Sequence, residues 1–140
     1  MTNFELLKHL KEQIDKDEWE TLADGGSLPV SHANRAILLQ MRDFKPAACK
    51  SLSAGKVRRL EDLLSSYLNQ YMEDRSDWHK WIIMVCLFRA FVAEEPLHPR
   101  EAVNYRIERT PAGVLYYCPV KETGEENICS FCPARKGGGA

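Results

Sequence analysis

Three cysteines and a histidine in the last third of the chain have types and spacing that could bind a metal ion. His98 is followed by Cys118 and then by the pair Cys129 and Cys132, so the spacing is H-x19-C-x10-C-x2-C. A C-x2-C step allows one tight turn to bring two thiolates to the same ion. Zinc in proteins takes four ligands in a tetrahedron, with sulfur at about 2.3 Å and nitrogen at about 2.0–2.1 Å. The sequence therefore predicts a structural zinc site with these four residues as ligands.

The fourth ligand and the chemistry of the site have alternatives. His98 stands beside Pro99, and a histidine in such a place is often a turn residue without a ligand role. Cys86 is the alternative fourth ligand. Cys86 lies in an apolar run, in which cysteine usually behaves as a small hydrophobic side chain. An iron–sulfur cluster is less favoured than zinc, because such clusters usually take four cysteines and only three gather here. Three free thiols, or a redox-active C-x2-C pair, are further interpretations, although the βαβ context of a thioredoxin-like pair is absent.

The same residues carry a resemblance to a known family. The run Leu115-Tyr116-Tyr117-Cys118-Pro119-Val120-Lys121, followed by Cys129-Ser130-Phe131-Cys132-Pro133 and preceded by His98-Pro99, resembles a family of uncharacterised archaeal proteins found mainly in methanogens. That family is described only as a domain of unknown function. The resemblance covers the last third of the chain and implies an archaeal, cytoplasmic origin, with matches at His98, Cys118, Cys129 and Cys132.

The overall composition excludes several classes of protein. A chain of 140 residues suits one domain with its own core, and its net charge of −1 creates no global attraction for nucleic acid or membranes. The longest apolar run, Trp81 to Ala93, is interrupted by Arg89 and is too short to span a bilayer. Neither a membrane span nor an export signal is visible, so we expect a cytoplasmic protein. In that compartment its five cysteines should stay reduced unless a metal holds them.

Helices are expected in the part of the chain that precedes the cysteine-containing tail. Apolar residues at helical spacing predict a helix from about residue 3 to 22, and further helices after the capping residues Ser31, Ser53 and Ser76. The last of these is apolar nearly all round from Trp81 onward, which is typical of a helix at the centre of a bundle. Arg89 is the one charge in this segment. We expect it to pair with a carboxylate, and the first helix offers candidates.

The period of the pattern changes in the tail. Residues 103–108 alternate as in a strand, Thr110-Pro111-Ala112-Gly113 is a turn signal, and 114–118 suits the returning strand. The predicted fold is mainly α, a bundle of about four helices with a small zinc-stabilised β-hairpin at the C-terminal end. The expected organisation is a helical bundle over 1–96, a metal-binding hairpin tail over 97–136 and a disordered end over 137–140.

No enzyme motif rises above background in the sequence, and there is no Ser–His–Asp or Cys–His arrangement and no phosphate-binding loop. We therefore expect a non-catalytic module that binds a partner, most simply another protein. The alternative is a metalloenzyme or redox protein in which the cysteines leave one metal position open. A nucleic-acid partner is weakly supported by five basic residues between Lys45 and Arg59, for which a solvated helix surface is the preferred interpretation.

Overall fold

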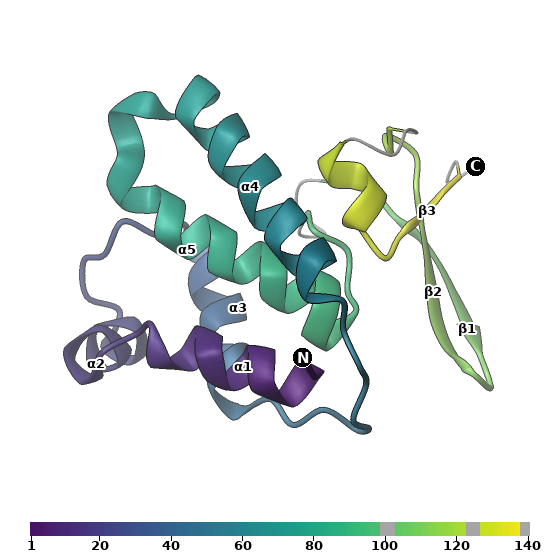
Figure 1. Cartoon of the computed structure of the whole chain (residues 1–140), viewed down its shortest axis with the longest axis horizontal. Helices are drawn as coiled ribbons and strands as arrows, with labels where there is room; N and C mark the ends of the chain where they lie inside the picture. Colours follow the sequence, from purple (N-terminus) through teal and green to yellow (C-terminus); the bar gives the residue numbers. More distant parts are fainter. Residues whose placement is uncertain (99–102, 123–126, 138–140) are drawn as a thin grey trace.

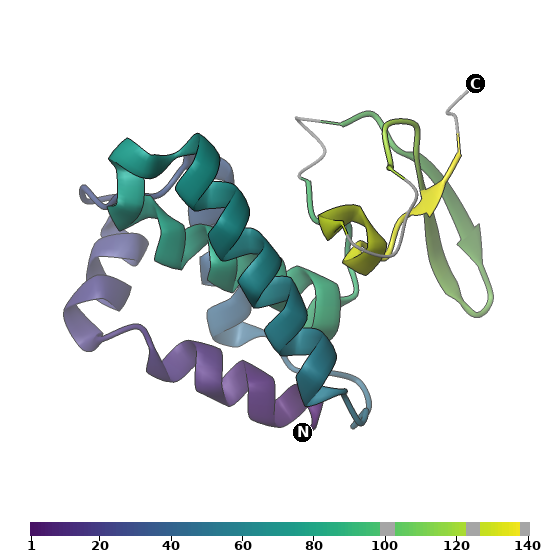
Figure 2. The same ribbon diagram turned by 45° about the horizontal axis from the view of Figure 1, so that its top comes forward.

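The computed structural model describes residues 1–98, 103–122 and 127–137. These ranges are mainly helical, as predicted, and a small sheet follows the helices. The α-helices are α1 (Asn3–Glu12), α2 (Lys16–Asp24), α3 (His32–Asp43), α4 (Ala54–Tyr71) and α5 (Ser76–Leu87). The remaining elements are the 3-10 turns η1 (Glu73–Arg75) and η3 (Ile128–Phe131), the π-helix η2 (Phe88–Ala93), and the strands β1 (Arg106–Thr110), β2 (Gly113–Cys118) and β3 (Arg135–Lys136). Figures 1 and 2 show the five α-helices gathered on one side of the molecule and the sheet on the other.

The apolar segment 81–93 forms the continuous axis of the helical part. α5 packs against α3 and α4, and its π-helical continuation η2 packs against α1. Trp81, Met84 and Phe88 have almost no exposed surface. The residues that cover them come from three other helices, namely Leu6, Leu10, Leu38, Met41, Leu60 and Leu64. A segment without a polar face is thus covered from several sides, which is the role its sequence predicted.

The single helix expected over residues 3–22 is wrong, because the chain forms two helices there. α1 ends at Glu12 and α2 begins at Lys16. Asp15 caps α2 by accepting a hydrogen bond from the Glu18 amide at 2.8 Å, and the Glu18 carboxylate accepts one from the Asp15 amide at 3.1 Å. This reciprocal capping box satisfies amides that a helix start leaves unpaired, so it favours a new helix over continuation of the first.

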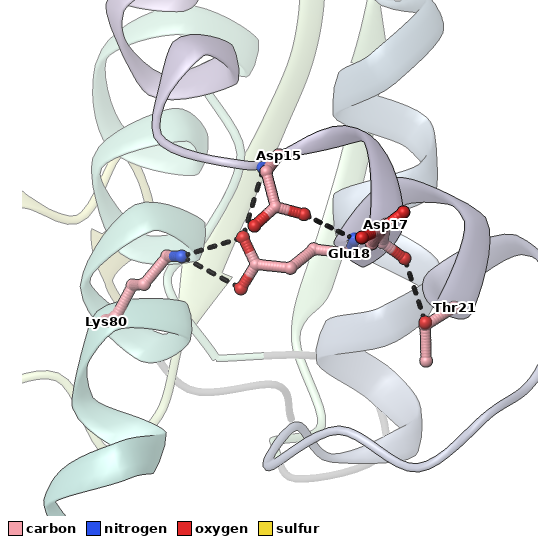
Figure 3. A network of polar contacts seen from close by, with 5 residues as sticks. All are labelled: Asp15, Asp17, Glu18, Thr21 and Lys80. Atoms are coloured by element: carbon pink, nitrogen blue, oxygen red, sulfur yellow. Dashed lines mark hydrogen bonds and ion pairs between the residues drawn. The ribbon is translucent and has the colours of Figure 1, made fainter.

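The start of α2 is also joined to the central helix. Lys80 on α5 donates to both Glu18 carboxylate oxygens at 3.1 Å, and Thr21 donates to the Asp17 carbonyl at 2.8 Å (Figure 3). Glu18 therefore closes the capping box and pairs with α5 at the same time. Lys80 and Glu18 keep much of their surface exposed, so the ion pair orients α2 more than it stabilises the fold.

The capping predictions were confirmed at two of three positions. Ser31 accepts from the Asn34 amide at 3.1 Å, and Ser53 accepts from the Lys56 amide at 3.2 Å. Ser76 is wrong as a cap, because it is already the first residue of α5 and the preceding residue makes no side-chain capping bond. The 3-10 turn η1 ends at Arg75, directly before the first residue of α5, so the backbone is already helical where α5 begins.

Arg89 is buried in η2 and has a carboxylate partner, but not one from the first helix. Its Nη1 lies 3.5 Å from Oε2 of Glu95, and its Nε donates to the Pro96 carbonyl at 2.6 Å. Glu94 ends η2 in the left-handed conformation with φ +54°, and its carboxylate pairs with Lys50 at 2.8 Å. The partner of Arg89 therefore comes from the segment that leaves η2, because the chain turns back there.

The sheet extends the predicted hairpin by one strand. β1 and β2 are antiparallel with Thr110 opposite Gly113, and Gly113 has φ +138°, which only glycine adopts easily. β3 then pairs in parallel with the end of β2, where Cys118 faces Lys136. The expected disordered end lies outside the described residues at 138–140, whereas the Gly137 amide donates to the Cys118 carbonyl at 3.2 Å.

Over residues 1–98, 103–122 and 127–137, no helix is both long and apolar enough to cross a membrane.

The capping box of α2 generates a stability prediction. Asp15→Ala should lower the free energy of unfolding by about 1 kcal/mol, because it removes the acceptor for an otherwise unpaired helix amide. Asp15→Asn, which keeps an acceptor oxygen, is the matched control and should cost much less. Urea denaturation followed by circular dichroism measures both. Equal losses for the two variants would contradict a capping role for Asp15.

Candidate metal centre

Cys118 lies at the end of β2, where the chain is held by hydrogen bonds on several sides. Its side chain is 4% exposed, and its carbonyl accepts from the Gly137 amide at 3.2 Å and from the Lys121 amide at 3.5 Å. The returning strand β3 lies beside it through the Cys118–Lys136 pairing. The first cysteine of the motif is therefore fixed by the same backbone contacts that close the sheet.

Cys129 lies in the 3-10 turn η3, and Cys132 follows directly after it. The Cys132 amide donates to the Cys129 carbonyl at 3.1 Å, which closes a tight turn between the two cysteines. Asn127 caps this turn through a hydrogen bond from the Ser130 amide to its side chain at 3.1 Å. The C-x2-C step thus forms a compact turn, as the spacing predicted.

The turn that carries Cys132 returns to the exit of the central helix. The Sγ atom of Cys132 accepts a hydrogen bond from the Leu97 amide at 3.4 Å. Leu97 immediately precedes His98, and the carbonyl of His98 accepts from the Tyr105 hydroxyl at 2.8 Å. Cys132 and His98 are far apart in sequence, but this contact brings Cys132 to the residue next to His98.

The thiols also affect one another through their charge. Burial raises the pKa of Cys86 to about 12; nearby Arg89 opposes this shift and the Cys132 thiolate adds to it. Burial likewise raises the pKa of Tyr105 to about 12, with further contributions from the Cys132 and Cys118 thiolates. Cys118 and Cys132 are therefore both close enough to Tyr105 to act on it, and Cys132 is close enough to Cys86.

The predicted ligands are gathered in one region without forming a coordination sphere. All four, His98, Cys118, Cys129 and Cys132, belong to the described residues, and so does Cys86. Within that part of the chain, no three or more His, Cys, Asp or Glu side chains are close enough together to hold one ion. Three thiols and an imidazole are nevertheless a donor set that zinc accepts, so the assignment of these residues stays a prediction.

Two residues that organise this region were missed by sequence reasoning. The Lys121 ammonium donates to the carbonyls of Cys132 at 3.0 Å and Ala134 at 2.6 Å, and thereby ties the chain after β2 to the turn. Tyr105 joins the start of the hairpin to His98. Neither contact has a signal in local spacing, because each depends on how the tail returns to the helices.

Comparison with known proteins places the chain in a family. Residues 7–137 match the family described as "uncharacterized protein conserved in archaea", DUF2115. The chain belongs to this family. It is also 28% identical over 87 residues to the UPF0305 protein MJ0646 of Methanocaldococcus jannaschii, an alignment that covers 59% of this chain and 52% of that protein. The chain thus spans about half the length of this curated relative, and no solved structure matches it. The resemblance to uncharacterised archaeal proteins is confirmed by these matches.

The raised pKa of Cys86 predicts its reactivity. In metal-free, folded protein, iodoacetamide at pH 8 should alkylate exposed Cys49 quickly and Cys86 slowly, because alkylation needs the thiolate. A pKa of about 12 instead of 9.0 lowers the thiolate fraction about a thousandfold. The rate at Cys86 should stay low through pH 9 and rise only towards pH 12. Peptide mapping by mass spectrometry measures both sites, and comparable rates at pH 8 would contradict the burial of the Cys86 thiol.

Proposed function

We propose that this chain is a non-catalytic, metal-stabilised module that binds another protein in the cytoplasm. In this proposal one zinc ion is bound by Cys118, Cys129, Cys132 and His98. The support for the metal is the return of the C-x2-C turn to the helix exit, where the Cys132 sulfur accepts from the amide next to His98. Completion of the site would require the side chains of the other ligands to move towards this point.

The tail has a physical need for such an ion. Its sheet consists of one short hairpin and the two-residue strand β3, and a hairpin of this size is only marginally stable in water. A metal bound by residues 98 to 132 would close a loop of 35 residues. Closing such a loop removes chain entropy from the unfolded state, so the free energy of metal binding would become folding free energy of the tail.

The environment of the two rivals favours His98 as the fourth ligand. Cys86 must lose a proton to bind zinc, and burial raises its pKa to about 12, which makes that loss costly. His98 is exposed and follows Leu97, which already contacts Cys132. A tetrahedral site of one imidazole and three thiolates is the result we propose.

The observation that carries the binding role is an apolar groove with a basic rim on α1. The groove has a volume of about 440 Å³, and Phe4, which is 45% exposed, forms part of its floor. Its other apolar residues are Leu7, Phe44 and Pro46, and its charged residues are Lys8, Lys11, Glu12 and Lys45. An exposed aromatic side chain inside an apolar groove is typical of a surface that another protein covers.

The charges of the rim define the partner. Three lysines face one glutamate around the groove. Lys8 and Glu12 are 4.0 Å apart and mostly exposed, so their pair is weak; Lys11 and Lys45 have no ion-pair partner among the described residues. The complementary occupant is a segment of a partner protein that places an apolar anchor over Phe4 and acidic side chains near the lysines.

Removal of the metal should disorder the tail alone. Elemental analysis should find about one zinc per chain, and Cys129→Ser with Cys132→Ser should abolish it. NMR spectra should then lose the dispersed signals of residues after about 96, whereas helical circular dichroism should persist because the helices have their own core. Cys49→Ser is the matched control and should retain zinc. A metal-free, reduced protein with a well-ordered tail would contradict the structural role.

The ligand count separates this proposal from its alternative. Cobalt substitution should give the spectrum of a tetrahedral site with three thiolates, which His98→Ala should perturb and Cys86→Ala should not. A site with three protein ligands and an exchangeable water would favour a metalloenzyme instead.

The groove predicts which peptides the protein selects. A random 12-residue peptide library panned against the protein should be enriched in sequences that combine an aromatic or large aliphatic residue with Asp or Glu. Lys11→Glu with Lys45→Glu should weaken the selected peptides about tenfold or more, since attraction at the rim becomes repulsion. Lys16→Glu with Lys56→Glu, which changes charge by the same amount at exposed positions outside the groove, should leave their affinity unchanged. Equal affinity for both double variants would contradict the assignment.

A further inference from the structure

A second cavity lies where the helical part meets the hairpin. It has a volume of about 380 Å³, at the small end of the range for ligand pockets. One wall is the start and middle of α3, with Ala33 and Ile37. The other lining residues include Arg89 near the start of η2, Glu95 just after η2, Tyr105 before β1 and Tyr116 on β2. None of these side chains belongs to the groove on α1.

The guanidinium of Arg89 opens onto this cavity. The side chain is only 10% exposed, its Nε is bound to Pro96, and its Nη1 lies 3.5 Å from Glu95, which is too long for a good hydrogen bond. Among the described residues, no fully enclosed side-chain nitrogen or oxygen lacks a hydrogen-bond partner. The two terminal nitrogens of Arg89 have no such bond to the described residues, so they are not fully enclosed, and Arg89 is one of the residues that line the cavity. A largely buried cation thus has unused N–H donors beside a small cavity.

Glu95 places the opposite charge in the same cavity. Its side chain is 31% exposed, and among the described residues its only contact besides the long one to Arg89 is from the Gln40 amide at 3.5 Å. Both charged groups are therefore incompletely satisfied by the protein. A ligand that brings an anion to Arg89 and a cation to Glu95 would give both groups charge-assisted hydrogen bonds, which are the stronger kind.

His32 and Gln40 add polar groups to the lining, and the rest of the wall suits an apolar body. Tyr105 and Tyr116 pack edge to face with their ring centroids 6.2 Å apart, and Tyr105 is fixed by its hydrogen bond to the His98 carbonyl. Ala33 and Ile37 face them from α3. Rings of this kind bind aromatic or aliphatic groups through their faces and edges.

We propose that this cavity binds a free α-amino acid with an apolar side chain. Its carboxylate pairs with the Arg89 guanidinium, its ammonium group pairs with Glu95, and its side chain lies between the tyrosines and α3. A simple carboxylic acid would be repelled by Glu95, and a simple amine would be repelled by Arg89. Only a zwitterion satisfies both groups without removing either one from its position.

Titration of the full-length protein with defined probes tests this site. L-Phenylalanine and L-leucine should bind saturably in calorimetry or NMR titrations. Hydrocinnamate, which lacks the amine, and phenethylamine, which lacks the carboxylate, should bind about tenfold more weakly or not at all. The ligand-induced NMR shifts should fall on Tyr105, Tyr116 and α3. No saturable binding of either amino acid, or equal binding of hydrocinnamate, would overturn the proposal.

Two variants assign the binding to this cavity. Glu95→Gln should weaken L-phenylalanine about tenfold without weakening hydrocinnamate, because it removes the negative charge that pairs with the ammonium group and repels a carboxylate. This variant is preferred to a change at Arg89, which also holds the Pro96 carbonyl. Tyr116→Ala should weaken both amino acids, whereas Tyr67→Ala, a matched change at an exposed position of α4, should have no effect. Unchanged affinity in Glu95→Gln and Tyr116→Ala would place any binding elsewhere and overturn the assignment.

Discussion

The rest of the structure depends on the need to cover the apolar segment 81–93 on several sides. Because this segment has almost no polar face, α1, α3 and α4 all pack against the α5 and η2 residues that form it, and their apolar side chains, mostly leucines, supply the contact surface. The positions of both ends of this segment are therefore set by the helices that pack against it. At the left-handed Glu94 the helix ends and the chain turns back, and it leads into the tail after the buried residues Pro96 and Leu97.

This constraint explains how far the helices could be predicted. The apolar periods and the serine caps at 31 and 53 are local, and they correctly placed α3 and α4. The break between α1 and α2 was also visible locally, since Asp15 and Glu18 have the spacing of a capping box. The apolar residues on both sides of the break keep a helical spacing, so the periodic pattern predicted one continuous helix and did not reveal the short interruption. The π-helical winding of η2 has no such signal and arises where the buried Arg89 must find partners.

The tail was predictable in its parts but not in its assembly. The turn at Thr110–Gly113 and the C-x2-C turn follow from residue type and spacing. The pairing of β3 with β2 and the contact of Cys132 with Leu97 do not, because they join segments far apart in sequence. The sequence could name candidate ligands, but it could not distinguish His98 from Cys86. That choice depends on the burial of Cys86, which is set by contacts between segments far apart in sequence.

The region where the tail leaves η2 joins the proposed metal centre to the cavity beside it. His98 and Tyr105 are connected by a hydrogen bond, Tyr116 lies two residues before Cys118, and both tyrosines line the cavity. A zinc ion that ordered the hairpin would therefore also fix one wall of the cavity, and a ligand in the cavity would in turn favour the ordered hairpin. Such coupling is reciprocal by thermodynamic necessity: whatever factor the metal adds to ligand affinity, the ligand adds to metal affinity. The groove on α1 lies on the helical part and is lined by none of these residues, so its occupancy should be independent of the metal.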